Sequence, residues 1–224
     1  MLASQTVENY LKTIYLAQAE LASRKELVPM GQLASALGVV PGTATTMVKT
    51  LAESGLARYE PYAGVRLTVA GERLAALVLR RHRLIELFLV KVLGMSWADV
   101  HDEAEQLEHA VSEQLIERID EMLGRPEVDP HGDPIPTASG AVARPDHLDL
   151  LSAPIDTPLV VTRVIDQGAD FLRFAEQRGL TPGSAIEITA RDAVADAVGL
   201  RTPAGACTIG ARAASKVLAR QDEI

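Results

Sequence analysis

The chain begins with apolar side chains at helical spacing, interrupted by two glycine-containing turns. Apolar residues recur every three or four positions between Ser4 and about Ala22, which predicts a helix with Ser4 as its N-terminal cap. A short helix closed by glycine is predicted over Pro29–Gly38, and a third helix over Thr43–Glu53. Pro41, in the turn between them, suits the first turn of a helix. This order is typical of a helix-turn-helix.

Two short strands are predicted after the third helix, over Leu56–Glu60 and Val65–Val69, around the turn Pro61–Gly64. A hairpin in this place is the wing of a winged-helix domain. Hydroxyls and a lysine on the third helix, with two arginines on the hairpin, suit the phosphates and base edges of duplex DNA. The alternative is a small helical domain without a DNA role. The predicted DNA-contacting residues are Pro41, Thr43, Thr45, Thr46, Lys49, Arg58 and Arg66.

Two longer helices are predicted next, from Gly71 to about Leu93 and from about Ser96 to Leu123. Each carries enough apolar positions to bury one stripe internally and another against a second copy, so a homodimer is expected. Residues 124–157 are rich in proline and glycine and are expected to form a linker or an ordered loop.

The last seventy residues are rich in short β-strand patterns. Strands are predicted over Leu159–Ile165 and Ser184–Thr189, with a short helix from Phe171 to Gly179 and further pieces up to Leu218. Several short strands in this length indicate a small SH3-like β-barrel. The predicted fold class is therefore mainly α with small β parts.

The net charge of −8 is unevenly distributed. Residues 1–75 carry seven basic against six acidic side chains, residues 76–150 seven against fifteen, and residues 151–224 eight against nine. The excess of acidic over basic side chains lies in the middle segment, which also holds all five histidines. A single cysteine excludes an internal disulfide, and neither a membrane span nor a signal peptide is apparent, so a cytoplasmic protein without a membrane role is expected.

The acidic middle segment places histidine and glutamate at helical spacing. His101, Glu105, Glu108 and His109 follow the i, i+4, i+7, i+8 pattern, and an i, i+4 histidine–carboxylate pair occurs about twenty residues earlier. Imidazoles and carboxylates that converge from two helices suit a borderline or hard divalent cation. A solvated acidic helix face with incidental histidines is the alternative.

Five short motifs, in this order and spacing, give the chain a family resemblance over essentially its whole length. The motifs are Ser4–Tyr15, Leu67-Thr68 with Gly71, Arg81–Leu84 with Glu86, Val100–Glu105 with Glu108-His109, and His131–Pro136. On these residues the chain resembles the diphtheria toxin repressor family of metal-dependent transcriptional regulators. The resemblance implies a winged helix-turn-helix over residues 1–74, a helical dimerisation and metal-binding domain over 75–145, a linker over 146–157 and an SH3-like (FeoA-type) domain over 158–224.

The same resemblance implies two metal sites. The ancillary set is His82, Glu86 and His101, with Gln167 and Asp170 as oxygen donors from the C-terminal domain. The primary, activating set is Asn9, Glu105, Glu108 and His109.

Two positions of the primary set depart from the family patterns. Iron-responsive members carry cysteine at the position of Glu105 and usually methionine at that of Asn9, whereas manganese-responsive members carry carboxylates at both. Without a thiolate, an oxygen-rich set with one imidazole favours Mn(II), with Fe(II) as the alternative. Zn, Co, Ni or Cd would still bind in vitro.

The implied function is a metal-dependent repressor that binds a palindromic operator as a homodimer and controls metal-homeostasis genes. Metal would tie the first helix to the helix that bears Glu105, and activation would weaken as pH falls through the histidine range. A metal-dependent hydrolase is disfavoured because the chain lacks His-Glu-x-x-His and any Ser/His/Asp or Cys/His arrangement, so no enzyme is expected. A metal-buffering protein would not need a winged helix.

Overall fold

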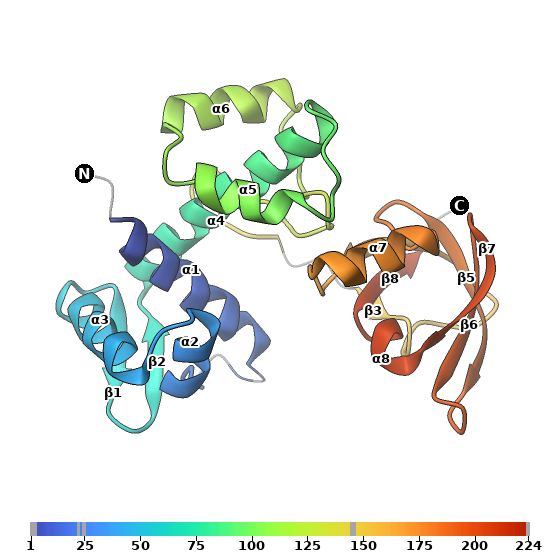
Figure 1. Ribbon diagram of the computed structural model, residues 1–224, viewed down its shortest axis with the longest axis horizontal. Coiled ribbons are helices and arrows are strands. Elements are labelled where there is room, and N and C mark those ends of the chain that lie inside the picture. Colours follow the sequence, from blue (N-terminus) through green and yellow to red (C-terminus); the bar gives the residue numbers. More distant parts are fainter. Residues whose placement is uncertain (1–3, 22, 24–25, 144–146, 223–224) are drawn as a thin grey trace. The chain divides into compact units, whose positions relative to one another are not determined.

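The computed structural model describes residues 4–21, 23, 26–143 and 147–222. They form two compact units, the first made of residues up to His82 with 136–142 and the second of residues 83–135 with the chain from 143 onward. The helix α4 (Val69–Lys91) runs through the boundary between them (Figure 1). The predicted domain boundary at 145/146 lies outside the described residues.

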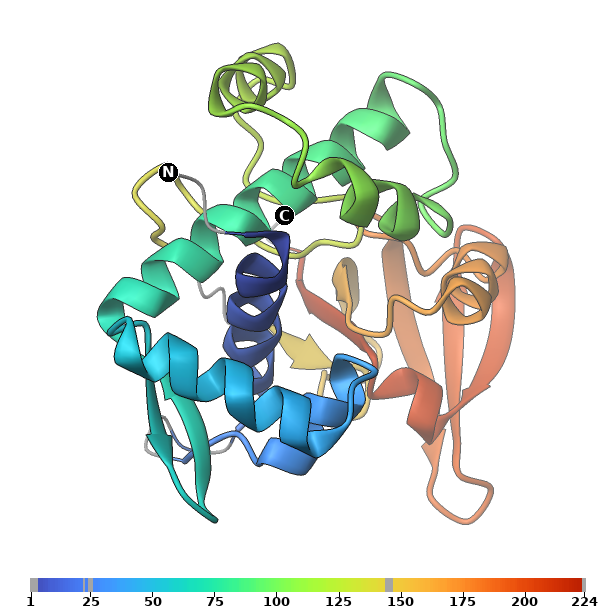
Figure 2. The same ribbon diagram turned by 60° about the vertical axis from the view of Figure 1, so that its left-hand side comes forward.

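The first unit is a winged helix. It contains α1 (Gln5–Glu20), α2 (Met30–Ala36), α3 (Pro41–Glu53) and the antiparallel hairpin β1 (Ala57–Glu60) and β2 (Gly64–Leu67). Figure 2 shows α3 lying across α1, with the hairpin extending beyond the end of α3. Its core is built from apolar residues of all these elements, among them Leu11, Ile14, Leu33, Val48, Leu51 and Val65.

Local side-chain contacts decide where these helices begin. Ser4 caps α1 as predicted, because its hydroxyl accepts a hydrogen bond from the backbone N–H of Val7. The predicted end of this helix at Ala22 lies outside the described residues. The second predicted hairpin strand ends two residues too late, because β2 ends at Leu67 and Val69 is already the first residue of α4. The Thr68 hydroxyl accepts from the N–H of Gly71, which fixes the helix start there.

The prediction of one continuous helix from Ser96 to Leu123 is wrong. The structure has two helices instead, α5 (Val100–Leu107) and α6 (Glu113–Met122). Ser112 starts the second one, because its side chain accepts from the N–H of Leu115. The turn between them leaves Glu108 at the C-terminal cap of α5 and His109 beyond the helix.

The remainder of the second unit contains a curved six-stranded sheet with the order β3-β8-β4-β5-β6-β7, in which neighbouring strands are antiparallel. Within the described residues β3 and β7 stay at the edges, so the predicted barrel does not close. Figure 1 shows the helices α7 and α8 beside these strands. The elements are β3 (Leu148–Asp149), β4 (Pro158–Val164), α7 (Ala169–Gln177), β5 (Ala185–Asp192), β6 (Ala197–Thr202), β7 (Gly205–Gly210), α8 (Ala211–Ala214) and β8 (Val217–Gln221).

The core of this sheet extends into the helical part of the same unit. Trp97 and Ala98, which precede α5, are buried in one cluster with Leu159, Val161 and Leu172. The loop that follows α6 also joins the sheet, because the N–H of Val164 donates to the carbonyl of His131 at 2.8 Å. None of the described helices combines the length and apolarity that a membrane crossing needs.

Candidate metal centre

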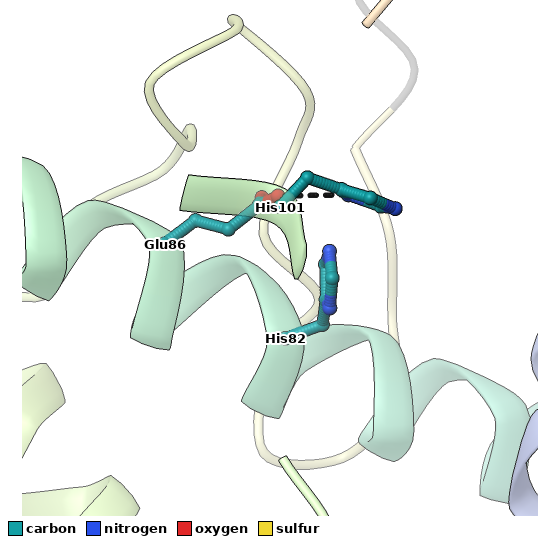
Figure 3. Close-up of side chains that lie close together, drawn as sticks. All are labelled: His82, Glu86 and His101. Atoms are coloured by element: carbon teal, nitrogen blue, oxygen red, sulfur yellow. Dashed lines mark hydrogen bonds and ion pairs between the residues drawn. The ribbon is translucent and has the colours of Figure 1, made fainter. Parts of the chain in front are cut away.

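Three predicted ligands converge where α4 faces α5. His82 and Glu86 lie one turn apart on α4, and His101 lies in the first turn of α5 (Figure 3). One ligand atom from each lies within 4.8 Å of the others. The carboxylate of Glu86 is 1% exposed and lies 3.2 Å from Nδ1 of His101, whose side chain is 45% exposed. The arrangement offers two imidazoles and one carboxylate with access from solvent.

A second group shares His82 with this one. Its imidazole lies within 4.8 Å of ligand atoms of Glu105 and Glu108. Glu108 is fully buried, and its carboxylate lies 3.2 Å from Nε2 of His109. Glu105 lies 3.8 Å from Nε2 of His101, which connects the two groups. Spacing along single helices could not show that His82 belongs to both, because the contact depends on how α5 packs against α4.

Asn9 lies on α1, in the first unit. Its amide oxygen Oδ1 is buried and has no hydrogen-bond partner among the described residues. A buried carbonyl oxygen without a partner is costly and is also available as a ligand for a hard cation. The neighbouring Glu8 forms an ion pair of 2.8 Å with Arg81 of α4, and both side chains are more than nine-tenths buried. This pair holds α1 against α4 inside the first unit.

A third group was missed by the sequence analysis. It contains Glu86, Asp129 and His131, all buried, with ligand atoms within 4.8 Å of one another. Nε2 of His131 lies 2.8 Å from the carbonyl oxygen of Trp97, which can only accept, so this nitrogen carries the proton. Nδ1 lies 3.9 Å from Glu86 and 4.0 Å from Asp129. A ligand histidine typically donates its other N–H to a backbone carbonyl in this way.

The third group concentrates negative charge in a buried place. Burial raises the pKa of Asp129 well above its usual range, and the nearby Asp133 and Glu86 carboxylates raise it further. Arg83, whose guanidinium lies 3.5 Å from Asp129, lowers that pKa but does not cancel the rise. A divalent cation would add to the positive charge that Arg83 brings to these buried carboxylates.

The predicted oxygen donors from the C-terminal domain have other partners. The side-chain amide of Gln167 donates to Asp133, which also pairs with Arg163 of β4 at 2.5 Å. Asp170 is exposed and lies 3.4 Å from Arg173. Asp170 belongs to none of the three ligand groups formed by the described residues.

The predicted DNA-contacting residues lie on one end of the first unit. Pro41 is the first residue of α3, and Thr43, Thr46 and Lys49 are exposed along it. The hydroxyls of Thr45 and Thr46 donate to backbone carbonyls one turn earlier. On the hairpin, Arg58 and Arg66 are directly opposite each other in the β1–β2 register. Like charges in this position are unfavourable unless an anion lies between them.

Three family models match the chain. The iron dependent repressor N-terminal DNA binding domain matches residues 2–65, the iron dependent repressor metal binding and dimerisation domain matches residues 68–137, and the FeoA domain matches residues 148–221. The iron-dependent repressor IdeR of Mycobacterium leprae is 30% identical over 82% of this chain and 83% of that protein. The regulator MntR of Lysinibacillus sphaericus is 33% identical over 53% of this chain and 81% of that protein.

Solved structures agree over nearly the whole chain. A manganese-dependent transcriptional repressor in complex with manganese aligns with a TM-score of 0.86 and 37% identity, over 96% of this chain and 100% of that one. The apo form of the manganese-activated repressor ScaR aligns with a TM-score of 0.77 and 32% identity, over 96% and 100%. The chain belongs to the diphtheria toxin repressor family of metal-dependent transcriptional regulators, which confirms the resemblance seen in the sequence.

Proposed function

We propose that this protein is a Mn(II)-responsive repressor. The observation that carries the proposal is the chemistry of the three ligand groups, which consist of carboxylates and imidazoles and contain no sulfur within the described residues. The one cysteine, Cys207, lies in β7 and belongs to none of them. Oxygen-rich sets suit Mn(II), whereas thiolates favour softer metals. A solved relative that is a manganese-dependent repressor adds support.

The proposed activating site consists of Asn9, Glu105, Glu108 and His109, as expected from the sequence, with His82 added because of its contact with both glutamates. The proposed ancillary site consists of His82, Glu86 and His101. Gln167 and Asp170 would donate oxygen ligands to it only after leaving their present partners. A bound cation would supply a positive charge that holds these ligands together.

The proposed dependence of DNA binding on metal comes from ligands that belong to different units. Asn9 belongs to the winged helix, whereas both glutamates and His109 belong to the second unit. A cation held by ligands from both favours the arrangement that binds DNA. A hundredfold preference for that arrangement is worth about 2.7 kcal/mol, enough to change DNA occupancy strongly.

We further propose that the protein acts in the cytoplasm as a homodimer on a palindromic operator. The matched metal-binding domain is described as a dimerisation domain. On α6, Leu115 is 50% and Met122 68% exposed, so this helix offers apolar surface to a second copy. A two-fold dimer reads two half-sites.

Metal-dependent DNA binding tests the proposal. DNA is selected from a random duplex library with Mn(II) present, and its affinity is then measured against Mn(II) and Fe(II) under anaerobic conditions. We expect affinity to rise about a hundredfold with Mn(II) at a free concentration at which Fe(II) has little effect. A stronger response to Fe(II) would make it an iron-dependent repressor. Metal binding without DNA binding would indicate a metal-buffering protein instead.

Replacing Arg58 or Arg66 by alanine is expected to weaken binding to specific and random DNA by the same factor. Each arginine that neutralises one phosphate releases about one counterion, so the slope of log affinity against log salt falls by about one unit per substitution. Fluorescence anisotropy at several salt concentrations measures both effects. Arg212→Ala is the control, because this exposed arginine lies on α8 of the other unit. An unchanged slope in both wing variants would contradict the assignment.

A further inference from the structure

One imidazole, that of His82, belongs to two of the ligand groups. In the first group it lies within 4.8 Å of ligand atoms of Glu86 and His101, and Figure 3 shows its ring pointing toward His101. In the second group it lies within 4.8 Å of ligand atoms of Glu105 and Glu108. A neutral imidazole has one unprotonated nitrogen, so it binds one cation at a time. His82 can therefore complete only one of the two groups at any moment.

The two groups differ in the ligands that they keep without His82. The first group keeps an imidazole and a carboxylate, those of His101 and Glu86. The second group keeps two carboxylates, those of Glu105 and Glu108. Imidazole suits zinc and other later transition metals, whereas carboxylate oxygens suit manganese. The first group is therefore the better set for Zn(II), and the second is the better set for Mn(II).

We propose that His82 is a selector, a ligand that completes either the ancillary site or the activating site but not both. An ion that holds His82 in the ancillary site leaves the activating site one ligand short. Binding at the two sites is then antagonistic, and each ion weakens the binding of the other by the same factor. Zn(II), which draws His82 toward His101, occupies the protein without full activation, although it binds most sites more tightly than Mn(II) does. This inference rests on the proposed metal sites and adds how they are coupled.

Repulsion between two nearby cations is the competing explanation for any antagonism. The two sites are close, because Nε2 of His101 lies 3.8 Å from the carboxylate of Glu105. Repulsion depends on the charges and the distance between the ions, so it would persist in a protein without the His82 imidazole. Antagonism that comes from a shared ligand disappears with that ligand. Removing His82 therefore separates the two explanations.

Two single-site backgrounds show whether His82 serves both sites. His101→Ala disables the ancillary site and Glu105→Ala disables the activating site, and both side chains are partly exposed, at 45% and 34%. His82→Leu is then added to each, because leucine fills a buried place but offers no ligand atom. Mn(II) binding to the first background is measured from the electron paramagnetic resonance signal of the unbound ion, and Zn(II) binding to the second by calorimetry. We expect His82→Leu to weaken both at least about tenfold.

The protein with both sites intact tests the antagonism itself. The second Mn(II) ion should bind at least about tenfold more weakly than the same site binds Mn(II) in its single-site background. With His82→Leu alone, both ions should bind with the affinities of the corresponding single-site His82→Leu variants. His147→Ala is the control, because this histidine pairs with Thr162 and belongs to none of the ligand groups of the described residues. It should change neither affinity.

His82→Gln provides a second variant that keeps a polar side chain in this buried place. Its neutral amide oxygen suits Mn(II) better than Zn(II), so Zn(II) binding to the ancillary site should fall more than Mn(II) binding to the activating site. An effect of either substitution on only one of the two sites, or antagonism that persists in His82→Leu, would overturn the inference. None of these measurements uses DNA. Absence of metal-dependent DNA binding by the unaltered protein would instead remove the proposed function.

Discussion

Glu105→Ala is expected to abolish the response of DNA binding to Mn(II) and to leave a folded protein. Glu105 lies with His82 and Glu108 in one ligand group, and its side chain is 34% exposed. Removing a partly exposed carboxylate leaves no buried cavity, so stability should change by less than about 0.5 kcal/mol. Removing a charged ligand from the proposed activating site should weaken metal affinity by about tenfold to a hundredfold. At fixed free Mn(II), the metal-dependent gain in DNA affinity should then disappear.

Glu103→Ala is the matched control, because Glu103 lies on the same helix α5, is exposed and belongs to none of the ligand groups. It removes the same charge and should keep the full Mn(II) response. Glu105→Cys adds a second readout, since a thiolate at this position favours later transition metals and should shift the order of activating metals away from Mn(II). Gel shifts and metal titrations measure these changes. A full Mn(II) response in Glu105→Ala would remove this residue from the switch.

The winged helix could be predicted from the sequence because its signals are local. Ser4 caps one helix, Pro41 begins another, and a tight turn separates the two strands of the hairpin. The break between α5 and α6 was missed because apolar residues continue at helical spacing across it. Ser112 is the local signal for a new helix start, and it was outweighed by that longer pattern.

The candidate metal site was predicted only in part, because only some of its residues lie close together in the sequence. Pairs one turn apart, such as His82 and Glu86, follow from spacing alone. The contribution of Asp129 and His131 depends on the loop after α6 returning to α4 and to β4, which no local pattern specifies. The motif around His131 was recognised as a family feature, and only the tertiary structure shows that its imidazole faces two carboxylates.

Gly132→Ala is expected to cause the largest loss of stability. Gly132 has φ +87°, and a Cβ there would lie 1.9 Å from the carbonyl oxygen of Thr162 and 2.8 Å from Cα of Arg163. Both atoms are backbone of β4, so they cannot turn aside as a flexible side chain would. The loop must move, and the bond from the N–H of Val164 to the carbonyl of His131 is lost. We expect the free energy of unfolding to fall by about 3–5 kcal/mol, from the strained φ, the clash and the lost hydrogen bond together.

Gly124→Ala separates the two causes. Gly124 has a similar φ of +77°, but a Cβ on it would meet no atom within 4 Å among the described residues. It should cost only about 1 kcal/mol, the strain of a left-handed conformation. The single tryptophan, Trp97, reports on the loop directly, because its ring stacks on His131 with centroids 5.6 Å apart. Urea unfolding followed by its fluorescence gives both free energies. Equal losses in the two variants would show that β4 yields to the added methyl group, and that the loop holding Asp129 and His131 is not fixed by this contact.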